Sequence, residues 1–329
     1  MKNIIKLILG VVIAAFMTQG CAKTVNPTLP AATPSPPQAS NPGVFWTDAT
    51  MSALFSAREG HGSVVYNNKI WVIGGEYVGG LLNDVWNSND GSTWSQVNNQ
   101  AGFPTRYDFS SLVFNNYMWV IGGFNGANGP MSDVWDSNDG ITWNQITGTA
   151  GFTGRFMHAG TSDGSNMWII GGFDGTNSYG DVWNSNSGVV WNMKTETAGF
   201  EPRYGHMCVS FNNEIWIIAG FDSTNYYGDV WNSSNGISWA QQTAKAGFSA
   251  RAYSTAFVYN NSIWVIAGYD GTNYLSDVWR SSDGIKWTQM TAAAGFNARD
   301  HHTGLAYNNS LWVIGGISGN RLDDVWWSQ

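Results

Sequence analysis

An arginine recurs along the chain every 48 or 49 residues, and arginine is the side chain best suited to holding an anion. A planar guanidinium binds a carboxylate through two parallel hydrogen bonds, so several arginines around one opening would cradle an anion or a sugar acid. A feature present in every repeat more often belongs to the fold, so the same column also suits side chains that hold neighbouring repeats together. The candidate ligand-binding arginines are Arg58, Arg106, Arg155, Arg203, Arg251 and Arg299.

Aromatic and acidic residues occupy two positions that vary between repeats. The residues directly after the arginines are Glu59, Tyr107, Phe156, Tyr204, Ala252 and Asp300. The residues directly after a recurring Gly-Gly or Ala-Gly pair are Glu76, Phe124, Phe173, Phe221, Tyr269 and Ile317. Aromatic rings with a few acids around them suit a carbohydrate or an extended peptide, so the aromatic members and Glu76 are further candidate ligand-binding residues.

Four histidines lie three positions after an arginine, and this spacing raises the possibility of a metal site. They are His61, His158, His206 and His302, while Phe109 and Ser254 fill the column in the other two repeats. No carboxylate joins these histidines at a fixed spacing, so we expect neither a metal nor a cofactor. Cys208 stands five positions after Arg203 in a column of small residues, and we interpret it as a structural side chain.

The whole chain after its first forty residues repeats with the same period. One tryptophan column consists of Trp71, Trp119, Trp168, Trp216, Trp264 and Trp312. Each period reads as four short strands, with Asn-Asn or Asp-Gly between strands as the hairpin signal and Gly-Gly at the end of the second strand. Because the tryptophan columns keep register with the strands, we expect them to pack between neighbouring units.

The spacing also predicts how the sixth unit is completed. The chain stops at Gln329, soon after the third strand of that unit. Trp46 precedes Arg58 by the same number of residues as Trp94 precedes Arg106. The segment around Trp46 should therefore supply the missing outer strand and remove an exposed sheet edge.

The Gly-Gly phrase, the aromatic residue after it, the tryptophan column and the arginine at the next strand's entry resemble the kelch family over residues 44–329. The resemblance implies an all-β, six-bladed propeller, similar to the central domain of the galactose oxidase superfamily. The family's tyrosine before the third-strand tryptophan departs from its usual spacing here, as at Tyr179 and Trp183. In such a blade the long 4-to-1 and 2-to-3 connections share one face, and related propellers carry their ligand there.

Two classes of function follow from this resemblance. We expect a non-catalytic interaction module that binds a glycan or a protein. The alternative is a sugar-modifying enzyme similar to sialic-acid mutarotase, in which an arginine and an acid such as Glu76 would act. Copper chemistry of the galactose oxidase kind fits less well, because Cys208 is the sole candidate thiol and no tyrosine precedes His301-His302.

The first 43 residues predict export and anchoring. Lys2 and Lys6 precede an apolar run that is short for a membrane span, so residues 1–20 read as a secretory signal. Cys21 after Gly20 resembles a bacterial lipoprotein site, and residues 21–43 form a Pro-rich spacer. We therefore expect a monomer at the bacterial cell envelope, attached to the membrane by its lipid alone or otherwise periplasmic or secreted. The net charge of −8 argues against a nucleic-acid partner.

Overall fold

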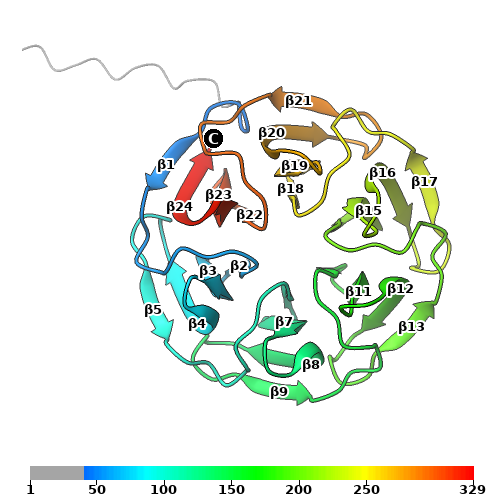
Figure 1. Ribbon diagram of the computed structural model, residues 1–329, viewed down its shortest axis with the longest axis horizontal. Coiled ribbons are helices and arrows are strands. Elements are labelled where there is room, and N and C mark those ends of the chain that lie inside the picture. Colours follow the sequence, from blue (N-terminus) through cyan, green and yellow to red (C-terminus); the bar gives the residue numbers. More distant parts are fainter. Residues whose placement is uncertain (1–40) are drawn as a thin grey trace, which may run out of the picture. The chain divides into compact units, whose positions relative to one another are not determined.

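The computed structural model describes residues 41–329, which form six four-stranded antiparallel sheets around a central opening (Figure 1). This arrangement confirms the prediction of an all-β, six-bladed propeller. The predicted signal, Cys21 and nearly all of the spacer lie outside the described residues. Within the described part of the chain, no helix is long and apolar enough to cross a membrane.

Each sheet is one blade, and in blades 1 to 5 the four strands follow one another outward from the axis in chain order. Blade 1 contains β2 (Gly62–Tyr66), β3 (Lys69–Tyr77), β4 (Gly80–Ser88) and β5 (Ser95–Asn98). Blade 2 contains β6 (Ser110–Phe114), β7 (Tyr117–Asn125), β8 (Gly129–Ser137) and β9 (Asn144–Thr147). Blade 3 contains β10 (Ala159–Ser162), β11 (Met167–Phe173), β12 (Ser178–Ser185) and β13 (Asn192–Thr195).

Blades 4 and 5 repeat the pattern, and blade 6 takes its outermost strand from the other end of the chain. Blade 4 contains β14 (Met207–Phe211), β15 (Glu214–Phe221), β16 (Tyr226–Ser233) and β17 (Ala240–Thr243). Blade 5 contains β18 (Thr255–Tyr259), β19 (Ser262–Tyr269), β20 (Tyr274–Ser281) and β21 (Thr288–Thr291). Blade 6 contains β22 (Thr303–Tyr307), β23 (Ser310–Ser318), β24 (Asn320–Ser328) and β1 (Thr47–Thr50).

The hairpin turns follow the predicted chemistry. Asn67 and Asn68 join β2 to β3 with φ angles of 48° and 54°, a conformation that asparagine tolerates better than most residues. The Gly74-Gly75 pair, in contrast, does not end its strand. The ladder between β3 and β4 shifts register at Gly74 and then continues to Tyr77, so the pair forms a bulge within the strand.

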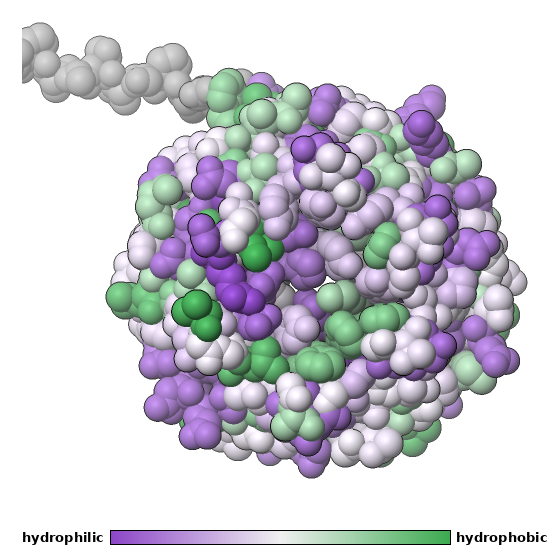
Figure 2. Space-filling view, in the orientation of Figure 1, coloured by the Kyte–Doolittle hydropathy of each residue, from purple (hydrophilic) through white to green (hydrophobic). Residues whose placement is uncertain are grey.

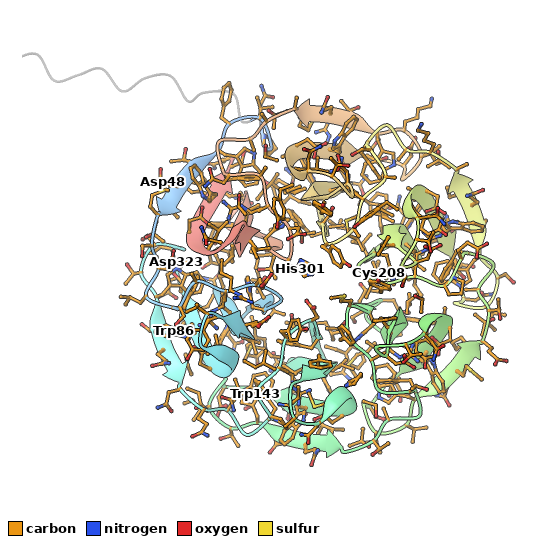
Figure 3. All side chains as sticks on the ribbon, in the orientation of Figure 1. Asp48, Trp86, Trp143, Cys208, His301 and Asp323 are labelled. Atoms are coloured by element: carbon orange, nitrogen blue, oxygen red, sulfur yellow. The ribbon has the colours of Figure 1, made fainter. Side chains whose placement is uncertain are left out.

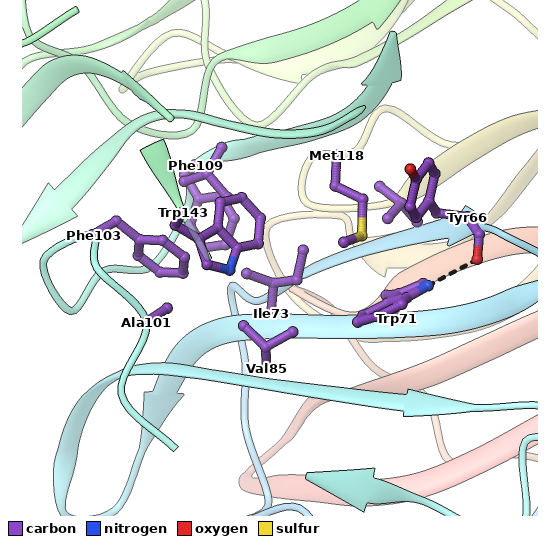
Figure 4. Close-up of a cluster of buried hydrophobic side chains, with 11 residues drawn as sticks. Tyr66, Trp71, Ile73, Val85, Ala101, Phe103, Phe109, Met118 and Trp143 are labelled. Carbon is purple, nitrogen blue, oxygen red and sulfur yellow. Dashed lines mark hydrogen bonds between the residues drawn. The ribbon is translucent and has the colours of Figure 1, made fainter. Parts of the chain in front are cut away.

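The tryptophans pack where blades meet. Figure 4 shows one such cluster, in which Ile73 and Val85 of blade 1 lie beside Phe109, Met118 and Trp143 of blade 2. The Asp-Gly turns take part as well. A Cβ atom at Gly91 would lie 2.1 Å from the ring of Trp312 in blade 6, so only glycine allows the turn to seat on its neighbour.

A buried ion pair joins each blade to the one before it. The guanidinium of Arg106 binds both carboxylate oxygens of Asp133 in its own blade and also donates to the carbonyl of Gly122. The backbone of the same arginine pairs with Leu82 and Gly75 in blade 1. All six arginines are fully buried and pair at 2.6 or 2.7 Å with an aspartate of their blade. These aspartates are Asp84, Asp133, Asp181, Asp229, Asp277 and Asp324.

The N-terminal segment closes blade 6 as its spacing predicts. Thr47 of β1 pairs with Trp327 of β24, and the amide of Gly43 donates to Ser328 Oγ at 2.8 Å. Trp46 lies just before the strand, 9% exposed, with its ring 5.0 Å from that of Phe296. The two ends of the described chain thus share one sheet, and β24 has no open edge.

We expect Trp46→Ala to destabilise the protein by about 3–5 kcal/mol, because it empties a large space between β1 and blade 5. Phe45→Ala is the matched control. The Phe45 side chain is 63% exposed, so its loss should change stability by no more than about 0.5 kcal/mol. Chemical denaturation of both variants measures the difference, and equal midpoints would contradict closure through Trp46.

We expect Asp133→Ala to cost about 3–5 kcal/mol, because Arg106 then stays buried without its counter-charge. The double variant Arg106→Met with Asp133→Leu should regain much of that loss, since it removes both charges together. Asp48→Ala, at an exposed position, serves as the control. Thermal unfolding of the four proteins tests the pair. If the single variant is as stable as the control, the ion pair does not hold the blades.

Candidate ligand-binding site

The long 4-to-1 connections and the 2-to-3 turns open on one face, around the entrance to the axial channel, which we call the channel mouth. The prediction of long 2-to-3 connections is wrong, because strands two and three extend until one to four residues join them. The six residues that stand two positions after the buried arginines are linked by backbone hydrogen bonds into a closed ring around the axis, which we call the mouth circle. Each of these amides donates to the carbonyl of the corresponding residue in the preceding blade at 2.8 to 3.1 Å. The members are Gly60, Asp108, Met157, Gly205, Tyr253 and His301.

All six members of the mouth circle adopt positive φ angles, between 47° and 61°. This conformation is uncommon for residues with a side chain, and it persists here because bonds to both neighbouring blades determine it. Glycine at position 60 has a further effect. A Cβ atom there would lie 2.6 Å from Asp108 Oδ1, so the missing side chain leaves space into which Asp108 reaches.

Asp108 and His301 flank Gly60 in the mouth circle and carry displaced pKa values. Burial raises the pKa of Asp108 to about 6, although the nearby His301 charge opposes the shift. Asp108 Oδ2 is buried and has no hydrogen-bond partner among the described residues. Both features mark Asp108 as a candidate functional group.

His301 lies in the central opening (Figure 3). Its ring stacks on Tyr253 with centroids 4.1 Å apart, and its Nδ1 lies 3.1 Å from Asp300 Oδ1. Burial alone would lower the pKa of His301. The contact with Asp300 and the charges of Asp108, Asp300 and Glu59 outweigh burial and raise the pKa to about 9. His301 is therefore a cation at neutral pH.

Above the mouth circle, an arc of nine aromatic rings follows the rim through blades 2 to 5. Successive rings contact one another, with centroids between 4.3 and 6.4 Å apart. This aromatic arc contains Tyr107, Phe124, Phe156, Phe173, Tyr204, Phe221, Tyr226, Tyr269 and Tyr274. Figure 2 shows hydrophobic residues lining the opening over β7 and β11.

Charged side chains lie on the rest of the rim, on blades 6 and 1, where Figure 2 shows hydrophilic residues with a few hydrophobic ones beside them. Arg321 Nη2 lies 2.7 Å from Glu59 Oε1 and 3.0 Å from Glu76 Oε2. Burial raises the pKa of Glu59, while His301 and Arg321 oppose that shift. The rim therefore has an aromatic part and a charged part.

The predicted site residues fall into two groups. Glu76, Tyr107, Phe124, Phe173, Phe221 and Tyr269 lie half-buried on the rim, and Phe156 and Tyr204 are buried among them. The six arginines do not reach the mouth with their guanidinium groups, because every one is buried against its aspartate. The expectation of an anion cradle made by Arg58, Arg106, Arg155, Arg203, Arg251 and Arg299 is therefore corrected, and the geometry assigns these arginines to blade packing.

Around the channel mouth, sequence reasoning missed two columns of residues. One is the mouth circle itself, two positions after each arginine. The other column lies on the third strand of the blade, where each residue pairs across the 2-to-3 turn with a rim residue of the second strand. It contains Tyr226, Tyr274 and Arg321. Arg321 could have been noticed as an arginine outside the repeating column, although its glutamate partners could not.

The four column histidines line the channel beneath the mouth circle, around a cavity of about 140 Å³. Burial first, and the charge of a nearby arginine second, lower the pKa of His61 to about 3, so its ring is neutral. His61 Nε2 lies 2.9 Å from Thr303 Oγ1 of blade 6 and so bridges two blades. Within residues 41–329, no three histidine, cysteine or acidic side chains converge as metal ligands. Cys208 lines a deeper part of the channel, where burial raises the pKa of its thiol.

The pKa of His301 predicts a pH dependence of stability. Because this pKa is about 9 in the folded chain and 6.5 in an ordinary histidine, its contribution is complete below pH 6.5 and lost as the pH rises through 9. The melting temperature of the wild type should therefore fall more between pH 6.5 and 9.5 than that of His301→Gln. Parallel curves would show that Asp300, Asp108 and Glu59 do not hold a proton on His301.

Comparison with known families agrees with the repeat. The model for the KLHDC2/KLHL20/DRC7 Kelch-repeats domain matches residues 192–328, and the Kelch motif matches residues 57–87 and 105–135. No curated protein matches the chain. These family matches lie in both halves of the chain and coincide with the blades described above, so the protein is a six-bladed β-propeller built from kelch repeats.

Proposed function

We propose that this propeller is a non-catalytic binding module that takes a neutral glycan over the channel mouth. Kelch propellers are typically interaction modules, and the rim here combines two surfaces that a sugar chain needs. The observation that carries the proposal is the aromatic arc, whose ends meet the charged part of the rim. The buried arginines and their aspartate partners recur in every blade, whereas the rim residues differ between blades and can make the ligand site specific.

The chemistry of a sugar matches both parts of the rim. One face of a pyranose carries C–H groups, which pack against the faces and edges of aromatic rings. Its hydroxyl groups donate hydrogen bonds, which the carboxylates of Glu59 and Glu76 would accept. A peptide offers fewer donors to such a set of acceptors, so we argue for the glycan.

The charge of the mouth favours a neutral ligand over a sugar acid. Four carboxylates, on Glu59, Glu76, Asp108 and Asp300, face two cations, on Arg321 and His301. With the six buried arginines already neutralised by aspartates, the mouth has no surplus positive charge for an anion. A ligand carboxylate would therefore be repelled.

A sugar-modifying enzyme is the second candidate, and one observation favours it. Asp108 and His301 have pKa values of about 6 and about 9, on either side of neutral pH, next to one cavity. Groups of this kind exchange protons with a bound substrate. A change in the NMR spectrum of a sugar incubated with the protein, absent with Asp108→Asn, would favour the enzyme.

Where this module acts is a separate proposal. The secretory signal, a lipid on Cys21 and a monomer at the bacterial cell envelope stay predictions from the sequence. In this arrangement residues 21–43 would be the spacer between the lipid and the propeller. A glycan of the cell surface would then be its partner.

Tyr226→Ala tests the aromatic arc. The Tyr226 ring is half-buried and stacks on Phe221 with centroids 4.3 Å apart, so its removal opens a gap in the platform without emptying a core. We expect the affinity for a neutral tetrasaccharide such as cellotetraose to fall about 5- to 30-fold, since an aromatic contact contributes about 1–2 kcal/mol. Titration calorimetry measures this loss.

Ile237→Ala is the matched control. Ile237 is 52% exposed on a 3-to-4 hairpin, which lies on the opposite face. Its replacement should leave both affinity and melting temperature unchanged. The proposal fails if the two variants bind the sugar equally well. It also fails if the wild type binds no sugar on a glycan array but captures proteins in a pull-down assay.

A further inference from the structure

A second hollow lies beside the channel mouth, between the 2-to-3 loops of blades 6 and 1. We call it the side groove. Its volume is about 420 Å³, three times that of the mouth cavity, which is room for a complete sugar unit. Its walls are mostly apolar and include Tyr77, Val78 and Ile317, with Arg321 and Asn320 at one side.

Unequal loop lengths create the side groove. The turn from β23 to β24 is the shortest of its kind and needs a single residue, Gly319, at a φ of 75°. The turn from β3 to β4 is longer and lifts Val78 until its side chain is 94% exposed. Val78 lies in a two-residue turn between Tyr77 and Gly80, where its exposed aliphatic side chain forms one wall of the groove.

Arg321 connects the side groove to the channel mouth. Its Nη2 contacts Glu59 and Glu76 on the rim, while the side chain keeps a quarter of its surface exposed. Nε is buried without a hydrogen-bond partner among the described residues, whereas Nη1 takes part in neither of these ion pairs. The guanidinium thus retains donors for a ligand, yet its charge is already exceeded by two carboxylates. A neutral acceptor such as a carbonyl oxygen fits this environment better than an anion.

We propose that the side groove binds the acetamido group of an N-acetylated sugar unit. The methyl group would pack against Tyr77, Val78 and Ile317, and the carbonyl oxygen would accept a hydrogen bond from Arg321. This inference rests on the proposed function and deepens it, because it names the class of glycan. A chain with one unit over the mouth circle and the next in the side groove would contact both parts of the rim.

Two tetrasaccharides with the same β-1,4 linkage test the inference. Chitotetraose carries an acetamido group on every unit, and cellotetraose carries a hydroxyl group in its place. We expect the wild type to bind chitotetraose at least 10-fold more tightly by titration calorimetry. Val78→Ser should reduce that preference to about 2-fold while leaving the affinity for cellotetraose unchanged, because Val78 lies outside the channel mouth.

Ile141→Ser is the matched control for Val78→Ser. It makes a similar change at an aliphatic side chain that is 59% exposed on the opposite face, so the preference should survive. Arg321→Lys keeps the positive charge beside the glutamates but loses the planar set of donors, and it should lower the preference for chitotetraose as well.

The outcomes separate the inference from the proposed function. Equal affinity of the wild type for both sugars, with binding still weakened by Tyr226→Ala, overturns the side-groove inference alone. No binding of either sugar overturns the proposed function together with the inference. The blocked peptide N-acetyl-trialanine amide offers the same methyl and carbonyl groups. If it binds as tightly as chitotetraose, the groove is a peptide site and the inference fails.

Discussion

The buried arginine–aspartate pair is the interaction on which the rest of the molecule depends. Removing two charges from water is costly, and a buried pair recovers that cost only with good geometry and further hydrogen bonds. Arg106 has both, because it meets Asp133 through two bonds and also donates to Gly122 and Pro104. Its backbone meanwhile belongs to the blade before. The pair therefore fixes the position of one blade relative to the next along the propeller axis. Hydrophobic contacts have less directional geometry and fix this position less precisely.

The position of every functional side chain follows from that fixed point. One residue after the arginine lies on the rim, two residues after it the chain enters the mouth circle, and three residues after it the side chain lines the channel. The six blades thus place three rings of residues, on the rim, in the mouth circle and along the channel, at the same level in every blade. Because the scaffold is symmetric, specificity arises only where the sets differ between blades. The aromatic arc and the charged part of the rim are such differences.

Spacing along the chain predicted what is local or repeated, and it failed for what meets across the axis. The blade number, the closure by Trp46 and the rim positions of Tyr107 and Phe124 all followed from register. The aspartate partner was overlooked although it stands 25 to 27 residues after its arginine in every blade. The contact between Arg321 and Glu59 joins residues from opposite ends of the chain, and no periodic pattern encodes it.

Because Glu59 and Arg321 lie near opposite ends of the chain, their contact in the charged part of the rim requires the propeller to close. Arg58 pairs its backbone with Leu322 and Gly316 of blade 6, so Glu59 reaches Arg321 only when blades 6 and 1 are joined. Blade 6 itself is complete only when β1 adds to β24. The aromatic arc, in contrast, is built from blades that follow one another along the chain. The aromatic part of the proposed site thus rests on contacts between consecutive blades, whereas the charged part, which would distinguish one sugar from another, requires the closing contact of the propeller.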